Sequence, residues 1–288
     1  MKNIFVIGSI NTDFNISAPH IPEKGETITG GGFFTAHGGK GANQATAAAR
    51  LGGKTYMCAC VGDDTFGKEA ADALSDAGAD ISNIRVVPGV PTGTAVIILA
   101  ENDNRIILDK GANAELSRTD IDDALARAKE GDILLCQLEN PIDIIGYALE
   151  KGKSLKMTVI LNPAPANAEI AKYLKFCDII TPNETELDIL GGKDEIRKSF
   201  AGTVIVTLGG DGYEINGKHF PCPKVKVVDT TSAGDTFCGG LAARLSLGDT
   251  LEDAARYGSC AASIACTRLG AQPSIPTAEE VGKSGLFI

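Results

Sequence analysis

An acidic residue stands near the start of a predicted helix, within a run of small residues: Asp229-Thr230-Thr231-Ser232-Ala233-Gly234-Asp235-Thr236-Phe237. Small residues let backbone N–H groups approach a bound group, and the first turn of a helix leaves its own N–H groups unpaired, which favours a phosphate. Asp235 would repel that phosphate unless it has a second task. A general base beside a transferring phosphoryl group is such a task. An Asp before an apolar run is more commonly a helix cap, and that alternative stays open.

The flanking residues predict how this segment is built. The β-branched residues of 225–228 predict a strand that ends at Asp229. Apolar residues at every fourth position from 237 to 245 predict a helix that begins near Gly234 or Asp235. The small residues therefore join a strand to a helix.

A second glycine-containing segment, 38–45, runs into an Ala-rich stretch that predicts a helix closed by Gly52. Lys40 and Asn43 would project towards whatever binds at the start of this helix. The segment is not a Walker loop, because Gly41 follows Lys40 where that motif has Ser or Thr. No G-x-G-x-x-G opens a helix after the first predicted strand, which weighs against a dinucleotide-binding fold.

Apolar strands alternate with helical patterns along most of the chain. The strands are predicted at 4–8, 55–61, 133–137, 158–161 and 204–208, and the helices at 65–77, 141–151, 167–176 and 249–269. This alternation predicts an α/β fold with a parallel sheet that is covered on both faces.

Two stretches, 12–36 and 91–109, depart from this alternation and predict strands of a small β-sheet lid. The second contains predicted strands at 94–100 and 105–109 around Asn102-Asp103-Asn104, which is a hairpin signal. No internal repeat or low-complexity linker divides the chain, so we expect a single domain over 1–288.

Polar residues follow several of the predicted strands. In an open parallel sheet the carboxyl ends of the strands meet at one edge, where ligands bind. Turns and caps are the commoner use of any one such residue, but the series predicts a binding crevice. Its members are Asn11, Asp13, Glu139, Asn140, Asn162, Asn183, Glu184 and Glu186.

Composition limits the class of protein. A net charge of -10 over 288 residues argues against a general nucleic-acid or anionic-membrane surface. The eight cysteines contain no C-x-x-C pair and stand mostly among apolar residues, which is typical of reduced thiols in a cytoplasmic protein. The apolar run at the N-terminus is too short for a signal peptide or a membrane span.

The two glycine-containing segments, together with 8–13, 137–139, 162–165, 181–186 and 268–274, resemble the ribokinase-type carbohydrate kinases over nearly the whole chain. The resemblance implies a three-layer α/β/α sandwich with a mainly parallel central sheet and a small β-sheet lid, and a homodimer joined through the lids. It also implies transfer of the ATP γ-phosphoryl group to the 5-hydroxyl of D-ribose, with Mg²⁺ present.

Other functions stay open beside this one. The substrate could be another sugar or a nucleoside, such as fructose, deoxyribose or adenosine, although 5% aromatic residues and no Trp favour a bare sugar. A non-catalytic regulator that binds sugar or nucleotide is the alternative from another class. A pure binder has no need of a base such as Asp235 at its phosphate site.

The resemblance also implies roles for individual residues. Asp235 would be the general base, and the amides of Ser232, Ala233 and Gly234 would form an anion hole. The implied sugar contacts are Asn11, Asp13, Gly39, Lys40, Asn43, Glu139 and Asp235. The implied nucleotide contacts are Asn183, Thr207, Gly209, Gly234 and Ser259, and Glu186 would hold Mg²⁺ through water. An activating K⁺ would be held by Asp229, Thr231, Ala265, Arg268, Gly270 and Ser274.

Three features depart from the family pattern. Ser232 stands where Gly or Ala is usual, and Ser259 stands in a region where many members carry a His near adenine. The segment 190–203 is shorter than in typical members.

Overall fold

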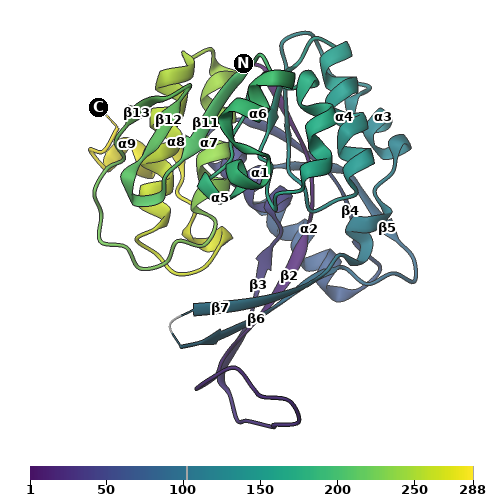
Figure 1. Ribbon diagram of the computed structural model, residues 1–288. Helices are drawn as coiled ribbons and strands as arrows, with labels where there is room; N and C mark the ends of the chain where they lie inside the picture. The colour runs from purple at the N-terminus through teal and green to yellow at the C-terminus, as the bar shows by residue number, and fades with distance from the viewer. Residues whose placement is uncertain (102, 288) are drawn as a thin grey trace.

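The computed structural model describes residues 1–101 and 103–287, and in this part of the chain a nine-stranded sheet forms the centre of the molecule (Figure 1). Its strand order is β13-β12-β11-β10-β9-β8-β1-β4-β5, parallel from β5 to β11 and antiparallel from β11 to β13. The strands are β1 (Asn3–Ile7), β4 (Lys54–Gly62), β5 (Asp80–Val87), β8 (Ile133–Cys136), β9 (Thr158–Leu161), β10 (Ile179–Ile180), β11 (Thr203–Thr207), β12 (Tyr213–Ile215) and β13 (Lys218–Phe220).

Helices cover both faces of this sheet, which confirms the predicted three-layer fold (Figure 1). Ile4 and Val6 of β1 pack in one apolar core, whereas Phe5 and Ile7 pack in the other, because successive side chains of a strand point to opposite faces. The first core includes residues of α1 (Lys40–Arg50), α2 (Thr65–Asp76), α7 (Ala233–Leu247), α8 (Leu251–Ala265) and α9 (Ala278–Lys283). The second includes residues of α3 (Arg118–Leu125), α4 (Ile142–Ser154), α5 (Glu184–Ile189), α6 (Gly192–Ser199) and the 3₁₀ helix η2 (Ala168–Phe176).

A second, four-stranded sheet projects from the body of the molecule, at the bottom of Figure 1. Its order is β3-β2-β6-β7, with β2 and β6 parallel and the other pairs antiparallel. The strands are β2 (Asn11–Ser17), β3 (Gly31–Gly38), β6 (Gly93–Ala100) and β7 (Asp103–Asp109). The predicted lid strands at 94–100 and 105–109 lie within β6 and β7. Asn102 of the predicted hairpin turn lies outside the described residues.

The strand predicted at 225–228 is wrong. These residues have no regular secondary structure, and Val227 and Val228 are 57% and 51% exposed. A strand needs a neighbour to pair with its backbone, but here the N–H groups of Val228 and Asp229 both donate to the carbonyl of Cys266, at 2.8 and 3.2 Å. The helix predicted after this segment is confirmed, because α7 begins at Ala233.

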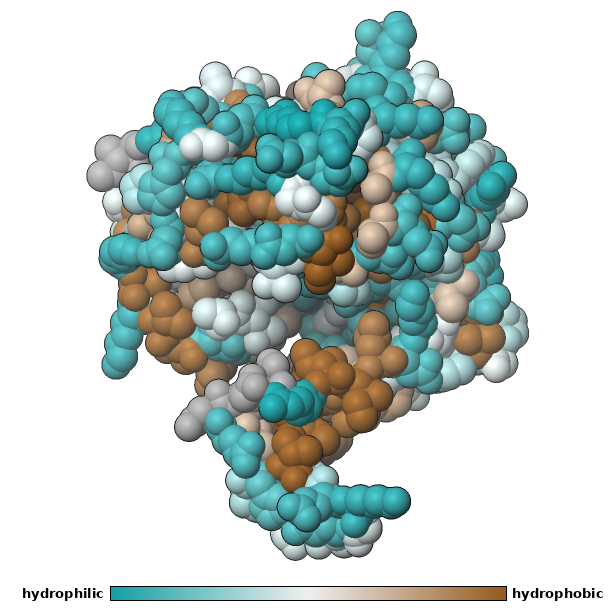
Figure 2. All heavy atoms as spheres, in the orientation of Figure 1, coloured by the Kyte–Doolittle hydropathy of each residue, from teal (hydrophilic) through white to brown (hydrophobic). Residues whose placement is uncertain are grey.

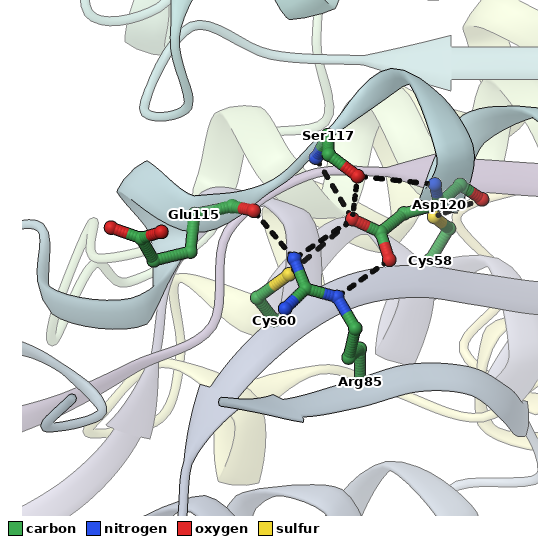
Figure 3. Close-up of polar contacts among 6 residues, drawn as sticks. All are labelled: Cys58, Cys60, Arg85, Glu115, Ser117 and Asp120. Carbon is green, nitrogen blue, oxygen red and sulfur yellow. Dashed lines mark hydrogen bonds and ion pairs between the residues drawn. The ribbon is translucent and has the colours of Figure 1, made fainter. Parts of the chain in front are cut away.

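Asp120 of α3 joins that helix to the edge strand β5 (Figure 3). Its carboxylate accepts hydrogen bonds from Arg85 Nε (2.7 Å) and Nη2 (2.9 Å), and from the N–H (2.8 Å) and hydroxyl (2.7 Å) of Ser117. Burial raises the pKa of Asp120, but these bonds outweigh it and hold the pKa below its ordinary value. Arg85 Nη2 also donates to the carbonyl of Glu115 at 2.5 Å, which ties down the 3₁₀ helix η1 (Gly111–Glu115).

Burial raises the pKa of the thiols beside this junction, Cys58 and Cys60, which disfavours the reactive thiolate. The Cys60 thiol lies 4.0 Å from a carboxylate oxygen of Asp120, and burial raises the pKa of Cys60 to about 12 (Figure 3). The eight cysteines are free in the part of the chain that the structure describes. Among the described residues no helix is long and apolar enough to span a membrane.

Candidate active site

The residues after the parallel strands meet the first turns of α1 and α7 at one edge of the sheet, as predicted for a binding crevice. A polar cavity of about 210 Å³ opens there. It is lined by Lys40, Asn162, Ala164, Thr181, Asn183, Glu186, Thr207, Thr230, Ser232, Ala233, Gly234, Asp235 and Cys238. The two glycine-containing segments of the sequence, nearly 200 residues apart, therefore face the same space.

Asp235 stands in the first turn of α7 and is 6% exposed. Its Oδ1 accepts a hydrogen bond from Gln44 Nε2 at 2.9 Å, and its Oδ2 accepts one from Asn43 Nδ2 at 3.1 Å. The N-cap of α7 is Ser232, and no side chain among the described residues caps this helix. Asp235 is therefore not the helix cap that its position in the sequence allows. Its carboxylate lines the cavity and points towards the first turns of α1.

Four acidic side chains share this edge with the ammonium group of Lys40, a partly buried residue. Burial, Glu139 and Asp235 together raise the pKa of Asp13 to about 7. Burial, followed by repulsion from Asp235, raises the pKa of Glu186. Attraction to Asp235 raises the pKa of Lys40, aided by Glu139 and Glu186 and opposed by burial, so Lys40 stays protonated. Its charge offsets part of the mutual repulsion of the carboxylates.

Glu139 organises the part of the site where the resemblance implies sugar contacts. Its Oε2 accepts hydrogen bonds from the N–H of Lys40 at 3.0 Å, from Asn11 Nδ2 at 3.4 Å and from the hydroxyl of Ser9. Gly39 adopts a φ of 87°, and a Cβ there would lie 2.7 Å from the N atom of Asn11. Glycine is therefore required for α1 to begin against β2.

The structure thus brings together the residues that the resemblance implies as sugar contacts, and it shows two further residues, missed by sequence reasoning, that hold them in place. Asn113 of η1 is buried and donates from Nδ2 to Asn11 Oδ1 at 2.8 Å, which fixes the Asn11 amide. Ser9 donates to Glu139 and accepts from the N–H of Gly41 at 3.3 Å. Ser9 lies inside a segment that the resemblance already marked, whereas nothing in the local sequence singles out Asn113.

The first turn of α7 is only partly open as an anion hole. The N–H of Ala233 donates to the carbonyl of Thr230 at 3.1 Å. Ser232 has a left-handed backbone, with φ 59° and ψ 12°, and its hydroxyl donates to the carbonyl of Ala271 at 3.3 Å. This backbone conformation favours glycine, which is one of the usual residues at this position of the family pattern. The anion hole stays a prediction.

An apolar cavity of about 330 Å³ adjoins the polar one, with Thr207, Thr230, Ala233 and Gly234 lining both. Its other lining residues include Gly209, Tyr213, Cys222, Val225, Val227, Phe237, Ser259, Ala262 and Cys266. A flat, mostly apolar group such as a nucleobase fits this lining. Thr207, Gly209, Gly234 and Ser259, which the resemblance implies as nucleotide contacts, all line this cavity.

Asn183 and Glu186 begin α5 and hold each other. Glu186 N–H donates to Asn183 Oδ1 at 2.8 Å, and Asn183 N–H donates to Glu186 Oε2 at 2.9 Å, so the two form a capping box. Both also line the polar cavity. The repulsion between Glu186 and Asp235 is one that a bound divalent cation would relieve, and carboxylate oxygen is a ligand type that Mg²⁺ prefers.

Two loops lie side by side where the resemblance implies a K⁺ site. Asp229 Oδ1 accepts from the N–H (2.9 Å) and hydroxyl (2.6 Å) of Thr231, and its Oδ2 accepts from the N–H of Gly270 at 2.9 Å. Burial raises the pKa of Asp229, but these bonds hold it below its ordinary value. The carbonyls and hydroxyls of these loops suit an alkali cation.

The remaining residues of the implied K⁺ site follow one another along the chain: Ala265 ends α8, Arg268 lies in the second loop, and Ser274 ends the 3₁₀ helix η4 (Gln272–Ser274). The hydroxyl of Ser274 donates to the carbonyl of Ala271 at 2.7 Å, and the N–H of Arg268 donates to the carbonyl of Ala265 at 3.0 Å. The guanidinium of Arg268 pairs with Glu280 at 2.6 Å. A backbone carbonyl of Arg268, not its side chain, is therefore the group to consider for the cation.

Comparisons with known proteins agree with this geometry. The model of the pfkB family carbohydrate kinases matches residues 1–278. A ribokinase from Haemophilus influenzae is 40% identical over 298 residues, covering 97% of both chains. A deoxyribokinase from Salmonella typhi is 36% identical, covering 96% of this chain and 97% of its own. The structure of a ribokinase from Arabidopsis thaliana, complexed with ribose and ATP, has a TM-score of 0.85 and 33% identity and covers 98% of each chain. The protein described here belongs to the pfkB family of carbohydrate kinases.

Proposed function

We propose that this kinase is a ribokinase, which transfers the γ-phosphoryl group of ATP to the 5-hydroxyl of D-ribose and releases ribose 5-phosphate and ADP. One observation carries the proposal: Asp235 lies in the polar cavity between the sugar-side residues and the apolar cavity. The choice of ribose is supported by the similarity to the ribokinase of Haemophilus influenzae. The presence of a base at the phosphate site favours an enzyme over a non-catalytic binder.

Three groups of residues have separate roles in the proposed reaction. Asn11, Asp13, Lys40, Asn43 and Glu139, with the backbone of Gly39, hold the sugar hydroxyls. Asp235 removes the 5-hydroxyl proton while that oxygen attacks the γ-phosphorus, and the bond from this phosphorus to the β-phosphate oxygen breaks. The amides of Ser232, Ala233 and Gly234 receive the developing charge, for which Ala233 must release the carbonyl of Thr230.

The nucleotide and its cations occupy the other side. The base enters the apolar cavity beside Thr207, Gly209 and Ser259. Asn183 and Glu186 would hold Mg²⁺ through water, and the ion would neutralise phosphate charge when bound. The K⁺ set would be Asp229, Thr231, Ala265, Arg268, Gly270 and Ser274, and binding there would stiffen the loop that leads into α7.

Substrate identity is tested by coupled ADP release with ATP and Mg²⁺, in K⁺ or Na⁺, with ribose, 2-deoxyribose, fructose, adenosine or no sugar. We expect turnover with ribose that falls when Na⁺ replaces K⁺. Preference for 2-deoxyribose, the substrate class of the relative from Salmonella typhi by name, would keep the mechanism and change the substrate. No turnover with any of them would favour the binder.

Sugar binding should weaken as the pH falls through about 7. The carboxylate of Asp13 accepts hydrogen bonds from sugar hydroxyls when it is ionised, and its pKa is raised to about 7. The ionised fraction falls about tenfold between pH 8 and pH 6, so the KM for ribose should rise by about that factor. Steady-state kinetics across this range test the expectation. Asp13→Asn should raise KM and flatten its pH dependence; a native KM that is constant from pH 6 to 8 would contradict it.

The proposal includes a homodimer joined through the lids. Large apolar side chains are exposed on the small sheet, among them Phe33 at 62% and Ile107 at 67%, and Figure 2 shows an apolar patch on the part of the lid next to the body. An exposed apolar sheet of this kind marks an interaction surface. Ile107→Asp should shift the mass measured by light scattering from dimer to monomer. Val86→Asp, at a residue 54% exposed on β5, is the matched control and should not. A monomeric native protein would refute the dimer.

The proposal also places the enzyme in the cytoplasm. Free thiols persist in a reducing compartment, and the ATP substrate is made available there. Fractionation of cells that express the protein tests this placement.

A further inference from the structure

Three buried side-chain amides stand in a row behind Asp235: Gln137, Gln44 and Asn162. Gln137 and Gln44 are fully buried and Asn162 is 7% exposed. Gln44 Nε2 donates to Asp235 Oδ1 at 2.9 Å and to Asn162 Oδ1 at 3.0 Å, while Gln44 Oε1 accepts from Gln137 Nε2 at 2.7 Å. Every hydrogen-bonding atom of the Gln44 amide is therefore used, and one of its partners is the carboxylate of Asp235.

Acceptors at two points fix the orientation of this amide row. Asn162 Nδ2 donates to the backbone carbonyl of Thr181 at 2.9 Å. Because a carbonyl only accepts, Asn162 must turn its own oxygen towards Gln44. The carboxylate of Asp235, when ionised, also only accepts. Both neighbours therefore require Gln44 to present Nε2, and Gln44 Oε1 is left to face Gln137.

This orientation leaves a polar atom at the far end of the row without a hydrogen-bond partner. Gln137 Oε1 is buried and has no hydrogen-bond partner in the described part of the chain. A Cβ on Gly8 would lie 2.1 Å from that oxygen, so the backbone directly after β1 closes the space beside it. A buried oxygen without a partner is destabilising, and such an atom calls for an explanation. The explanation is that Gln137, in this orientation, can donate its N–H to Gln44 Oε1.

The two oxygens of Asp235 differ as a result. Oδ1 is held from within the protein by Gln44, whereas Oδ2 is held by Asn43, a proposed sugar contact whose own Oδ1 has no partner among the described residues. Asn43 can therefore turn when a sugar binds, but Gln44 cannot. Oδ2 is the oxygen left to face a sugar hydroxyl.

We propose that Gln44 is a positioning residue that holds Oδ1 of Asp235 so that Oδ2 takes the proton, and that the N–H of Gln137, which faces Gln44 Oε1, supports the orientation that Asp235 and Asn162 require of Gln44. This inference rests on the role of Asp235 proposed above. As the sugar oxygen bonds to the γ-phosphorus and the phosphorus–oxygen bond to ADP breaks, the hydroxyl proton moves to Oδ2. Oδ1 is closed to it because an N–H of Gln44 already points at that oxygen.

Gln44→Met tests the first part, because Met has a similar volume and no donor. We expect kcat to fall at least tenfold while the KM values for ribose and ATP stay within threefold. Thr46→Val is the matched control: Thr46 is also fully buried on α1, its hydroxyl has no partner among the described residues, and kcat should stay within twofold. Melting curves identify the folded fraction. A kcat for folded Gln44→Met within twofold of the native value overturns the proposal.

A pair of substitutions at Gln137 tests the second part without touching Asp235. An ionised Glu at this position only accepts, so it would repel Gln44 Oε1 and oppose the orientation in which Gln44 donates to Asp235. We expect kcat of Gln137→Glu to be at least tenfold below that of Gln137→Met, measured at pH 9 to ionise a buried glutamate. Equal kcat values would overturn the role of Gln137.

The outcome for Asp235→Asn separates this inference from the proposed function. If Asp235→Asn abolishes turnover and Gln44→Met does not lower it, the assignment of Asp235 as the base is supported and the positioning role of Gln44 is refuted. If Asp235→Asn retains turnover, the assignment of the base fails, and the inference about Gln44 fails with it.

Discussion

Asp235→Asn should lower kcat by about 10³-fold, the scale of a lost general base, while sugar binding changes little. Asn has the shape of Asp, but its side-chain amide does not accept a proton at neutral pH. The protein can accommodate the substitution, because the new side-chain amide would keep its oxygen towards Gln44 and turn its NH₂ group towards Asn43. The oxygen of Asn43 has no partner among the described residues and can rotate to accept that group.

Steady-state kinetics and calorimetric sugar binding measure these two effects separately. Asp143→Asn is the matched control, since Asp143 also stands in the first turn of a helix, α4, but is exposed to solvent. It should leave kcat unchanged. A kcat for Asp235→Asn within tenfold of the native value would show that another group takes the proton.

Lys40→Met has the second-largest expected effect, a fall in kcat/KM of about 100-fold, which is the scale of one lost electrostatic contact to a developing charge. Without this ammonium group, Asp13, Glu139, Asp235 and Glu186 repel one another and repel the phosphate. Loss of this charge would also raise the pKa of Glu186 further, because Lys40 lowers it in the native protein.

The measurement is kcat/KM for both substrates, together with melting curves. Lys68→Met on α2 is the control, because the side chain of Lys68 is 78% exposed and pairs only with Asp72 among the described residues. A change of less than threefold for Lys40→Met would mean that the carboxylates are balanced by another cation when the substrates are bound.

The layered fold was predictable because buried parallel strands have a strong signal. The run 4–8 is apolar throughout and indeed forms β1, whose two faces enter different cores. The two-residue strand β10 has no comparable signal, because two residues are too few to show a periodic pattern. The segment 225–228 has the composition of a strand, but pairing depends on a neighbour, which a local pattern does not reveal.

The candidate site was predictable where it lies in glycine-containing segments and beyond that only through family resemblance. Asp235, Lys40 and Asn43 stand in such segments. Gln44 stands in one too, yet its importance depends on burial and on the direction of its amide, which the sequence does not state. Asn113 reaches Asn11 across 102 positions from a 3₁₀ turn, a contact that only the tertiary fold creates.

The strand β2 belongs to the lid, yet its first residues include Asn11 and Asp13, whereas Asp235 belongs to a helix of the body. On the roles proposed above, part of acceptor recognition lies in the lid and activation of the hydroxyl lies in the body, so these parts are encoded in distant segments of the gene. If these roles hold, we expect substitutions along β2 to change which acceptor fits without altering the residues proposed to move the phosphoryl group. This modular division gives a physical reason for one scaffold to serve several sugars, and it makes residues 11–17 the first place to redesign acceptor choice.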